Sequence, residues 1–106
     1  LSKLGLSPND ALNALLSDDS FRETRQIIFI DSKCRTAAYT GKNTKAWSGH
    51  LVGENYVAGG NLLTCDKVVQ KMCDGFSLFE GNLEGKLLAA LDHGWQEGGD
   101  RSFRSC

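Results

Sequence analysis

Gln26-Ile27-Ile28-Phe29-Ile30-Asp31 is the stretch that decides the fold class of this chain. It is rich in β-branched and aromatic residues and is apolar at consecutive positions, which predicts a strand covered on both faces. Ser32-Lys33-Cys34-Arg35 can turn the chain, and Thr36-Ala37-Ala38-Tyr39-Thr40 can pair back as the second arm of a hairpin. A strand covered on two sides needs elements above and below it, so we expect a layered domain.

A short helix is expected before this hairpin. Ser7-Pro8-Asn9-Asp10 combines serine at the N-cap, proline at the first helical position and an acidic residue three positions after the cap. Leu12, Leu15 and Leu16 then fall on one face. The polar run Ser17-Asp18-Asp19-Ser20 ends the pattern, which predicts a short helix with one apolar side.

The second half of the chain predicts a short strand and two helices. After an irregular segment from Gly41 to Gly53, Tyr56-Val57-Ala58 is a strand candidate, and Thr64 is expected to cap the next helix. That helix has a broad apolar stripe, formed by Val68, Val69, Met72, Cys73 and Phe76.

The last helix is expected to start at Asn82 and to end at Gly98-Gly99. The order of helix, β-hairpin, short strand and two helices predicts an α+β domain in which helices cover a mainly antiparallel sheet. One side of the last helix is expected to be buried, and it holds Leu83, Leu87, Leu88, Leu91 and Trp95.

Length and composition limit the function classes. The 106 residues suffice for a single domain, residues 1–106, with a modest core. A net charge of -1 provides no basic field for phosphates, so nucleic acid is not expected as a partner. The longest apolar run, Ile27-Ile28-Phe29-Ile30, is far shorter than the roughly 20 residues of a membrane span, so no span is expected.

Cysteine spacing leaves two alternatives open. Cys34, Cys65, Cys73 and Cys106 include no C-x-x-C pair, so neither a metal nor any other cofactor is expected. They are disulfide candidates, although Cys65 and Cys73, about 12 Å apart on one predicted helix, would each have to pair elsewhere. Paired cysteines would favour an extracellular or periplasmic location, and free buried thiols a cytoplasmic one.

Two residues are candidates for catalysis. His50, in Trp47-Ser48-Gly49-His50, could serve as a general base or ligand, or could only hydrogen-bond backbone and shape its loop. Cys65 follows Thr64 at a predicted helix N-terminus, where the helix dipole can lower the pKa of a thiol. Because no partner base accompanies Cys65, a disulfide or an inert thiol is the alternative.

Ligand binding is the other candidate chemistry. Asp100 and Arg101 follow two glycines, and the guanidinium fork of Arg101 suits carboxylates or phosphates. The alternative is a helix C-cap followed by an ion pair in a loop. Gly59-Gly60-Asn61 lacks the lysine and spacing of a phosphate loop, so Asn61 joins His50, Asp100 and Arg101 only as a candidate contact to a small ligand.

An ordered set of short motifs resembles an uncharacterised family related in fold to the N-terminal-nucleophile hydrolases. That resemblance implies an αββα sandwich, of which this chain is similar to the central part only. The attacking group in such hydrolases is the side chain of the first residue, and Leu1 has no nucleophilic atom. The motifs, in order, are Leu6-Ser7-Pro8, Ala11-Leu12, Arg25-Gln26, Ala38-Tyr39-Thr40-Gly41, Trp47-Ser48-Gly49-His50, Gly53-Glu54, Gly60-Asn61 and Gly98-Gly99-Asp100-Arg101.

Three functions follow as hypotheses. The first is an assembly or interaction role without autonomous activity, in which a partner protein or self-association completes the sheets and relieves their exposed edges. The second is an amide-bond hydrolase whose nucleophile lies outside this chain. The third is a small-ligand binding domain. The leucine at position 1 favours the first hypothesis over enzymatic activity of the chain alone, and it suggests a fragment or a processed end.

Overall fold

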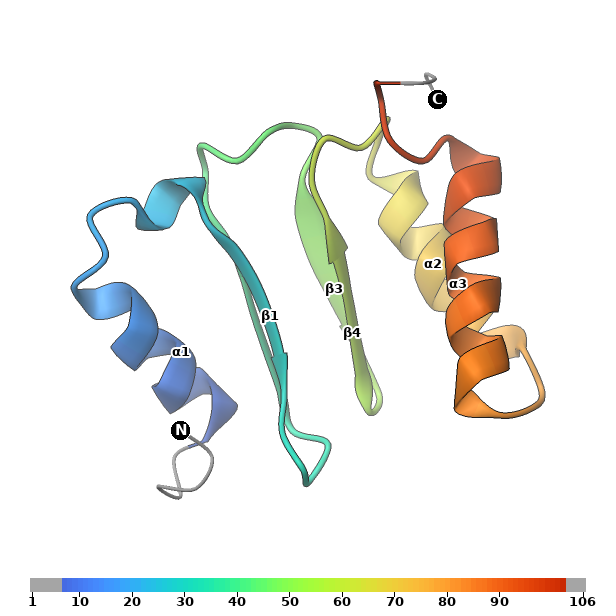
Figure 1. The fold of residues 1–106 in the computed structure, drawn as a ribbon, viewed down its shortest axis with the longest axis horizontal. Helices are drawn as coiled ribbons and strands as arrows, with labels where there is room; N and C mark the ends of the chain where they lie inside the picture. The colour runs from blue at the N-terminus through green and yellow to red at the C-terminus, as the bar shows by residue number, and fades with distance from the viewer. Residues whose placement is uncertain (1–6, 103–106) are drawn as a thin grey trace.

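The computed structural model describes residues 7–102, which form four layers in the order helix, sheet, sheet, helix pair (Figure 1). The predicted α+β class is therefore confirmed, with two small antiparallel sheets in place of one. The elements are α1 (Pro8–Ser17), the 3-10 helix η2 (Arg22–Thr24), β1 (Gln26–Ile30), β2 (Thr36–Thr40), β3 (Gly49–Gly53), β4 (Tyr56–Gly60), α2 (Lys67–Leu78) and α3 (Leu83–Glu97).

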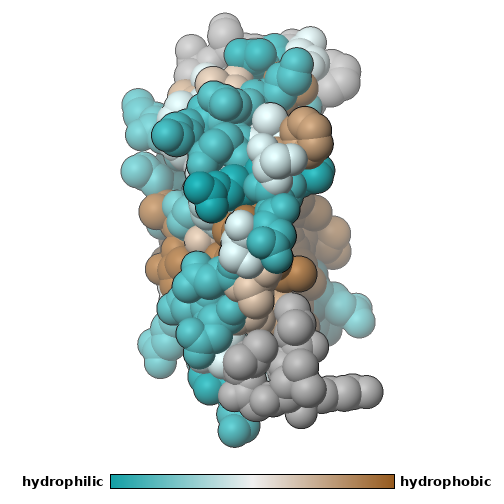
Figure 2. All heavy atoms as spheres, turned by 90° about the vertical axis from the view of Figure 1, so that its left-hand side faces the viewer, coloured by the Kyte–Doolittle hydropathy of each residue, from teal (hydrophilic) through white to brown (hydrophobic). Residues whose placement is uncertain are grey.

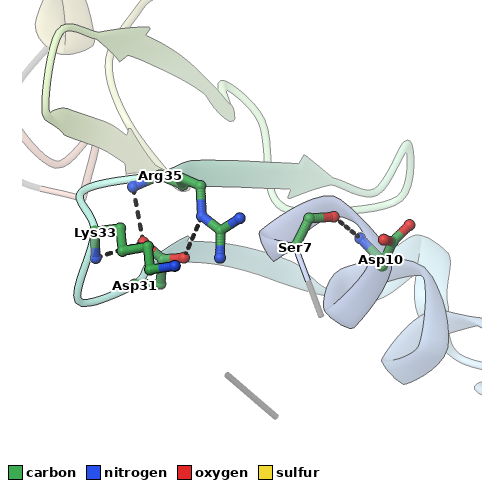
Figure 3. Close-up of polar contacts among 5 residues, drawn as sticks. All are labelled: Ser7, Asp10, Asp31, Lys33 and Arg35. Carbon is green, nitrogen blue, oxygen red and sulfur yellow. Dashed lines mark hydrogen bonds and ion pairs between the residues drawn. The ribbon is translucent and has the colours of Figure 1, made fainter. Parts of the chain in front are cut away.

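Helix α1 begins where the sequence predicts. The Ser7 hydroxyl accepts a hydrogen bond from the Asp10 backbone N–H at 3.1 Å (Figure 3). Pro8 occupies the first turn. The buried side of the helix packs on the first hairpin, where Leu12, Leu16 and Ala37 form a core cluster. Leu15 is exposed, so only part of the predicted leucine face is buried. The outer surface on this side of the molecule is mainly hydrophilic (Figure 2).

The first hairpin pairs β1 with β2 antiparallel, from Gln26 opposite Thr40 to Ile30 opposite Thr36. Asp31 organises its turn. The Asp31 carboxylate accepts hydrogen bonds from the Lys33 and Arg35 backbone N–H groups, at 2.9 and 2.8 Å, and from Arg35 Nε at 2.7 Å (Figure 3). The Asp31 side chain is only 2% exposed, so these bonds replace water around the carboxylate.

The prediction that β1 is covered on both faces is only half right. Ile27 and Phe29 pack against the α1 core cluster. Ile28 and Ile30 point the other way, because side chains alternate along a strand, and they remain 47% and 50% exposed. A methyl group added to Gly59 of β4 would lie 3.3 Å from Ile28 Cγ2. The two sheets therefore approach closely at Ile28 but leave much of this face uncovered.

The second hairpin contains a strand that the sequence did not reveal. Gly49–Gly53, expected to be irregular, forms β3 and pairs antiparallel with β4, so that His50 lies opposite Gly59. Glycine and a histidine have weak strand preferences, and pairing with β4 overrides them.

The two long helices are correctly predicted in type but not in every boundary. Asn82 caps α3 as predicted, and its side chain accepts from the Gly85 N–H at 2.8 Å. Helix α2 begins at Lys67, with Asp66 at the N-cap position, so the predicted cap at Thr64 is wrong. Cys65 consequently precedes the helix instead of lying on it.

The leucine-rich side of α3 is exposed, contrary to the prediction. Helix α3 meets α2 through small residues: Ala90 and Gly94 are buried, and a methyl group on Gly75 would lie 2.6 Å from the Ala89 carbonyl oxygen. Small residues form the closest contact with α2, and the large apolar residues lie beside it, where Leu87 and Leu91 line an apolar groove with Phe76. Their exposed fractions are Leu83 63%, Leu87 50%, Leu88 68%, Leu91 63% and Trp95 52%.

Candidate functional site

A cavity of about 590 Å³ lies where the end of β2, the start of β3 and the first turn of α2 meet. Its wall combines an imidazole, an indole, a cation, a carboxylate and an amide. These side chains, with the hydroxyl of β2, belong to Thr40, Lys42, Trp47, His50, Asp66 and Gln70.

His50 and Thr40 are in contact at this cavity. His50 lies on β3 and Thr40 ends β2, and His50 Nδ1 is 2.9 Å from Thr40 Oγ1. Both residues are partly buried. The contact joins the two hairpins side chain to side chain, so His50 does more than hydrogen-bond the backbone of its own loop.

Gln26 links this pair to the rest of both sheets. Its Nε2 lies 3.1 Å from Thr40 Oγ1, 2.9 Å from the Gly49 carbonyl oxygen and 3.0 Å from the Gly60 carbonyl oxygen. The Gln26 Oε1 accepts from Asn61 Nδ2 at 3.2 Å. The structure thereby places two predicted ligand residues, His50 and Asn61, in one hydrogen-bond network.

Gln26 and Thr40 are residues that sequence reasoning missed as members of the site. Each is an ordinary polar residue at one end of a strand. The sequence signal was the expected hairpin. Gln26 begins its first strand and Thr40 ends its second, so antiparallel pairing places them opposite each other. Their approach to His50 depends on the packing of one sheet on the other.

A second pair of hydroxyls orders the connection between β2 and β3. Thr44 Oγ1 donates to the Gly41 carbonyl oxygen at 2.8 Å and lies 2.6 Å from Ser48 Oγ. Because the Thr44 proton is used by Gly41, Ser48 donates to Thr44. These bonds hold the segment that carries Trp47 and Ser48 against the cavity.

Asp100 and Arg101 belong to a different part of the surface. Asp100 forms an isolated antiparallel bridge with Leu63, and the Arg101 N–H donates to the Leu62 carbonyl oxygen at 2.9 Å. The Asp100 carboxylate accepts from the Ser102 N–H at 2.7 Å. Hydrogen bonds from Ser102 lower the Asp100 pKa. Asp100 and Arg101 therefore connect the end of α3 to the segment before α2 through backbone hydrogen bonds.

The disulfide candidates differ in their surroundings. Cys34, in the first hairpin turn, and Cys73, on α2, are free thiols, which is one of the two alternatives that the sequence left open. Their elements lie in different layers, and Cys73 instead faces an apolar groove with Phe76. Burial raises the Cys73 pKa, and a hydrogen bond with Tyr56 partly offsets this effect. Cys106 lies outside the described residues.

Within residues 7–102, no cluster of three or more His, Cys, Asp or Glu side chains could hold a metal ion. No helix in the same range has the length and apolar character of a membrane span.

Comparison with known proteins gives one family. The fold is similar to the crystal structure of protein SPO2555 from Silicibacter pomeroyi, which is described by the DUF1028 family model, with a TM-score of 0.87 and 33% sequence identity. The match covers 92% of this chain and 43% of that one, so this chain spans less than half of its relative's length. No curated protein gives a significant match. The model of the family of unknown function DUF1028 matches residues 1–106, and the chain therefore belongs to the DUF1028 family.

Proposed function

We propose that residues 1–106 are an assembly scaffold: part of an αββα sandwich of the N-terminal-nucleophile hydrolase type, which binds further polypeptide to cover its open faces. The observation that carries this proposal is the exposed apolar side of α3, described above. The layer order helix, sheet, sheet, helix pair supports the sandwich assignment (Figure 1).

Burial of the exposed apolar side of α3 would be energetically favourable. Large apolar patches are rare on the surface of a monomeric protein and usually mark an interface. Leu88 and Leu91 are 68% and 63% exposed, although each leucine would contribute about 1.5–3 kcal/mol if fully buried. Helix α1, at the other end of the layers, has a mainly hydrophilic outer surface (Figure 2). The outer surface at α1 thus suits water, and the exposed leucines of α3 suit contact with further polypeptide.

The sheets support the same proposal. Within residues 7–102 each sheet has two strands, so every strand in this range has one edge that no other described strand pairs with. An isolated two-stranded ribbon is marginally stable, and its open edges are templates for pairing with added strands. Added strands would also cover Ile28 and Ile30, which lie on the open face between the sheets.

The proposed occupant is polypeptide from the remainder of a DUF1028 domain. The alignment with SPO2555 leaves more than half of that longer chain without a counterpart here. A segment of the same domain meets the open faces at a high effective concentration, which a separate partner does not. A second copy of residues 1–106 is the alternative occupant, which the experiment must distinguish.

Truncation of α3 leucines in the full-length protein tests this proposal. Leu91→Ala should lower the free energy of unfolding by about 2–5 kcal/mol if further polypeptide buries this side chain. Leu15→Ala is the matched control, because Leu15 is 50% exposed on α1, and it should cost much less. Chemical denaturation measures both. Equal small effects would contradict the proposal.

Sedimentation identifies the occupant. Residues 1–106 alone, at micromolar concentration, should self-associate or unfold, and the full-length protein should remain a folded monomer. A stable, well-folded monomer of residues 1–106 would contradict the assembly role. If the full-length protein dissociates and loses its stability on dilution, a second copy is the occupant instead.

A further inference from the structure

We infer that Thr40 is a nucleophile for acyl transfer, with His50 as its general base and Gln26 as a positioning residue. The substrate class is a small ester or amide that fits the cavity beside them. This inference goes beyond the assembly role and is independent of it, because it rests on the Thr40–His50 contact and not on the open faces.

The geometry matches the requirement for an activated hydroxyl. A nucleophile and its base must lie within about 2.6–3.2 Å of each other, and Thr40 Oγ1 and His50 Nδ1 are 2.9 Å apart. In the tautomer that carries its proton on Nε2, His50 accepts the Thr40 hydroxyl proton at Nδ1. Both residues line the cavity of about 590 Å³, so the reacting atoms are open to a ligand.

Gln26 directs the hydroxyl proton of Thr40. Its side-chain amide donates to Thr40 Oγ1 at 3.1 Å, which occupies one oxygen lone pair and leaves the hydroxyl proton to point toward His50. A hydrogen bond donated to an oxygen also favours its anionic form, so the same contact stabilises the developing alkoxide. The other N–H of the amide donates to the carbonyl oxygen of Gly49, at 2.9 Å, or of Gly60, at 3.0 Å, and this bond holds the amide in place.

The cavity wall offers groups for the carbonyl oxygen and for the acyl chain. Lys42 and Gln70 line it and can donate hydrogen bonds to an oxygen that becomes negatively charged. Trp47 provides an apolar surface in the same wall. This mixture suits a compact acyl group with an aromatic or aliphatic part.

The proposed reaction balances with water as its co-reactant. Thr40 Oγ1 forms a bond to the carbonyl carbon while its proton moves to His50 Nδ1. The bond from that carbon to the leaving group then breaks, and the leaving group takes the proton from His50. Water next attacks the threonine ester, His50 takes its proton, and Thr40 regains a proton as the acid departs.

An acylation assay on the full-length protein, with p-nitrophenyl acetate as the probe, tests the inference. Trypsin cuts after Arg35 and Lys42, so the peptide of residues 36–42 should gain one acetyl group, which fragment ions should locate on Thr40. Thr40→Val should abolish both the label and nitrophenol release, and Thr40→Ser should retain them. His50→Gln should slow acylation about 100-fold.

The matched control is Thr36→Val, which removes a hydroxyl from the same strand, the same face and the same tryptic peptide. Its acylation rate should equal that of the unchanged protein. An unchanged circular dichroism spectrum of Thr40→Val shows that its loss of acylation does not come from unfolding. Label confined to Tyr39 or Lys42, absence of acylation, or equal acylation of Thr40 in His50→Gln would overturn the inference.

Discussion

The side-chain amide of Gln26, on β1, donates a hydrogen bond to the carbonyl oxygen of Gly60, at the end of β4, over 3.0 Å. The same nitrogen lies 2.9 Å from the Gly49 carbonyl oxygen at the start of β3. Gly49 and Gly60 pair with each other, so one side chain of the first sheet binds the open end of the second. Gln26 therefore joins the two sheets through polar contacts, beside the Thr40–His50 contact and the apolar approach at Ile28.

Replacing Gln26 should weaken this connection. Gln26→Leu leaves the Gly49 and Gly60 carbonyl oxygens without their side-chain donor, and unsatisfied buried polar groups cost about 1–3 kcal/mol. We expect the free energy of unfolding to fall by that amount in urea denaturation. Gln70→Leu, at an exposed position, should change it by less than about 0.5 kcal/mol. Equal effects of the two substitutions would show that Gln26 does not join the sheets.

Asp31 should make stability depend on acidic pH. Desolvation raises its pKa, but the hydrogen bonds from Arg35 and Lys33 together outweigh that effect and lower the pKa below its usual value. A carboxyl whose pKa is lower in the folded state stabilises the fold above the unfolded pKa, near 4, and loses this contribution as the pH falls through the folded pKa.

Asp31→Asn therefore should reduce stability at neutral pH, and its difference from the unchanged protein should shrink as the pH falls below about 4. Thermal unfolding across this pH range measures the effect. Glu54→Gln, in the turn of the other hairpin, is the control and should show a nearly constant difference. The hypothesis fails if the Asp31→Asn difference is also constant with pH.

Gly75 should be intolerant of a side chain. Gly75→Ala places a methyl group 2.6 Å from the Ala89 carbonyl oxygen, so α2 and α3 must move apart. Overpacking of this kind costs about 1–3 kcal/mol, more than the gain in helix propensity from replacing glycine. Lys71→Ala, exposed on the same helix, should be close to neutral in chemical denaturation. A stabilised Gly75→Ala protein would contradict the observed helix contact.

The cysteines should differ in reactivity. Exposed Cys34 should react rapidly with iodoacetamide in the folded protein, and Cys73 should react slowly, because it is partly buried and desolvation raises its pKa. Peptide mapping measures both rates, with the unfolded protein as the control in which the two rates converge. Intact mass before and after reduction then tests the remaining disulfide candidates, Cys65 and Cys106. Comparable native rates at Cys34 and Cys73 would contradict the placement of Cys73.

Local elements were predictable because local interactions define them. Ser7 caps α1 through Asp10, three residues away, and Asn82 caps α3 through Gly85 in the same way. Consecutive β-branched residues indicate β1 without reference to any other segment. The candidate site was predictable only in part: His50 and Asn61 were identified, but Gln26 and Thr40, which connect them, were not.

The sequence by itself determined the helices, the first hairpin and the α+β class, since caps, turns and periodicity act over a few residues. Only the tertiary structure decided which apolar face of α3 is covered, because Gly75 and Ala90 allow a closer helix contact than the leucines do. It also decided that His50 meets Thr40, since that contact requires one sheet to pack on the other. The periodicity of the sequence identifies an apolar helix face, but the tertiary packing determines which residues that face contacts.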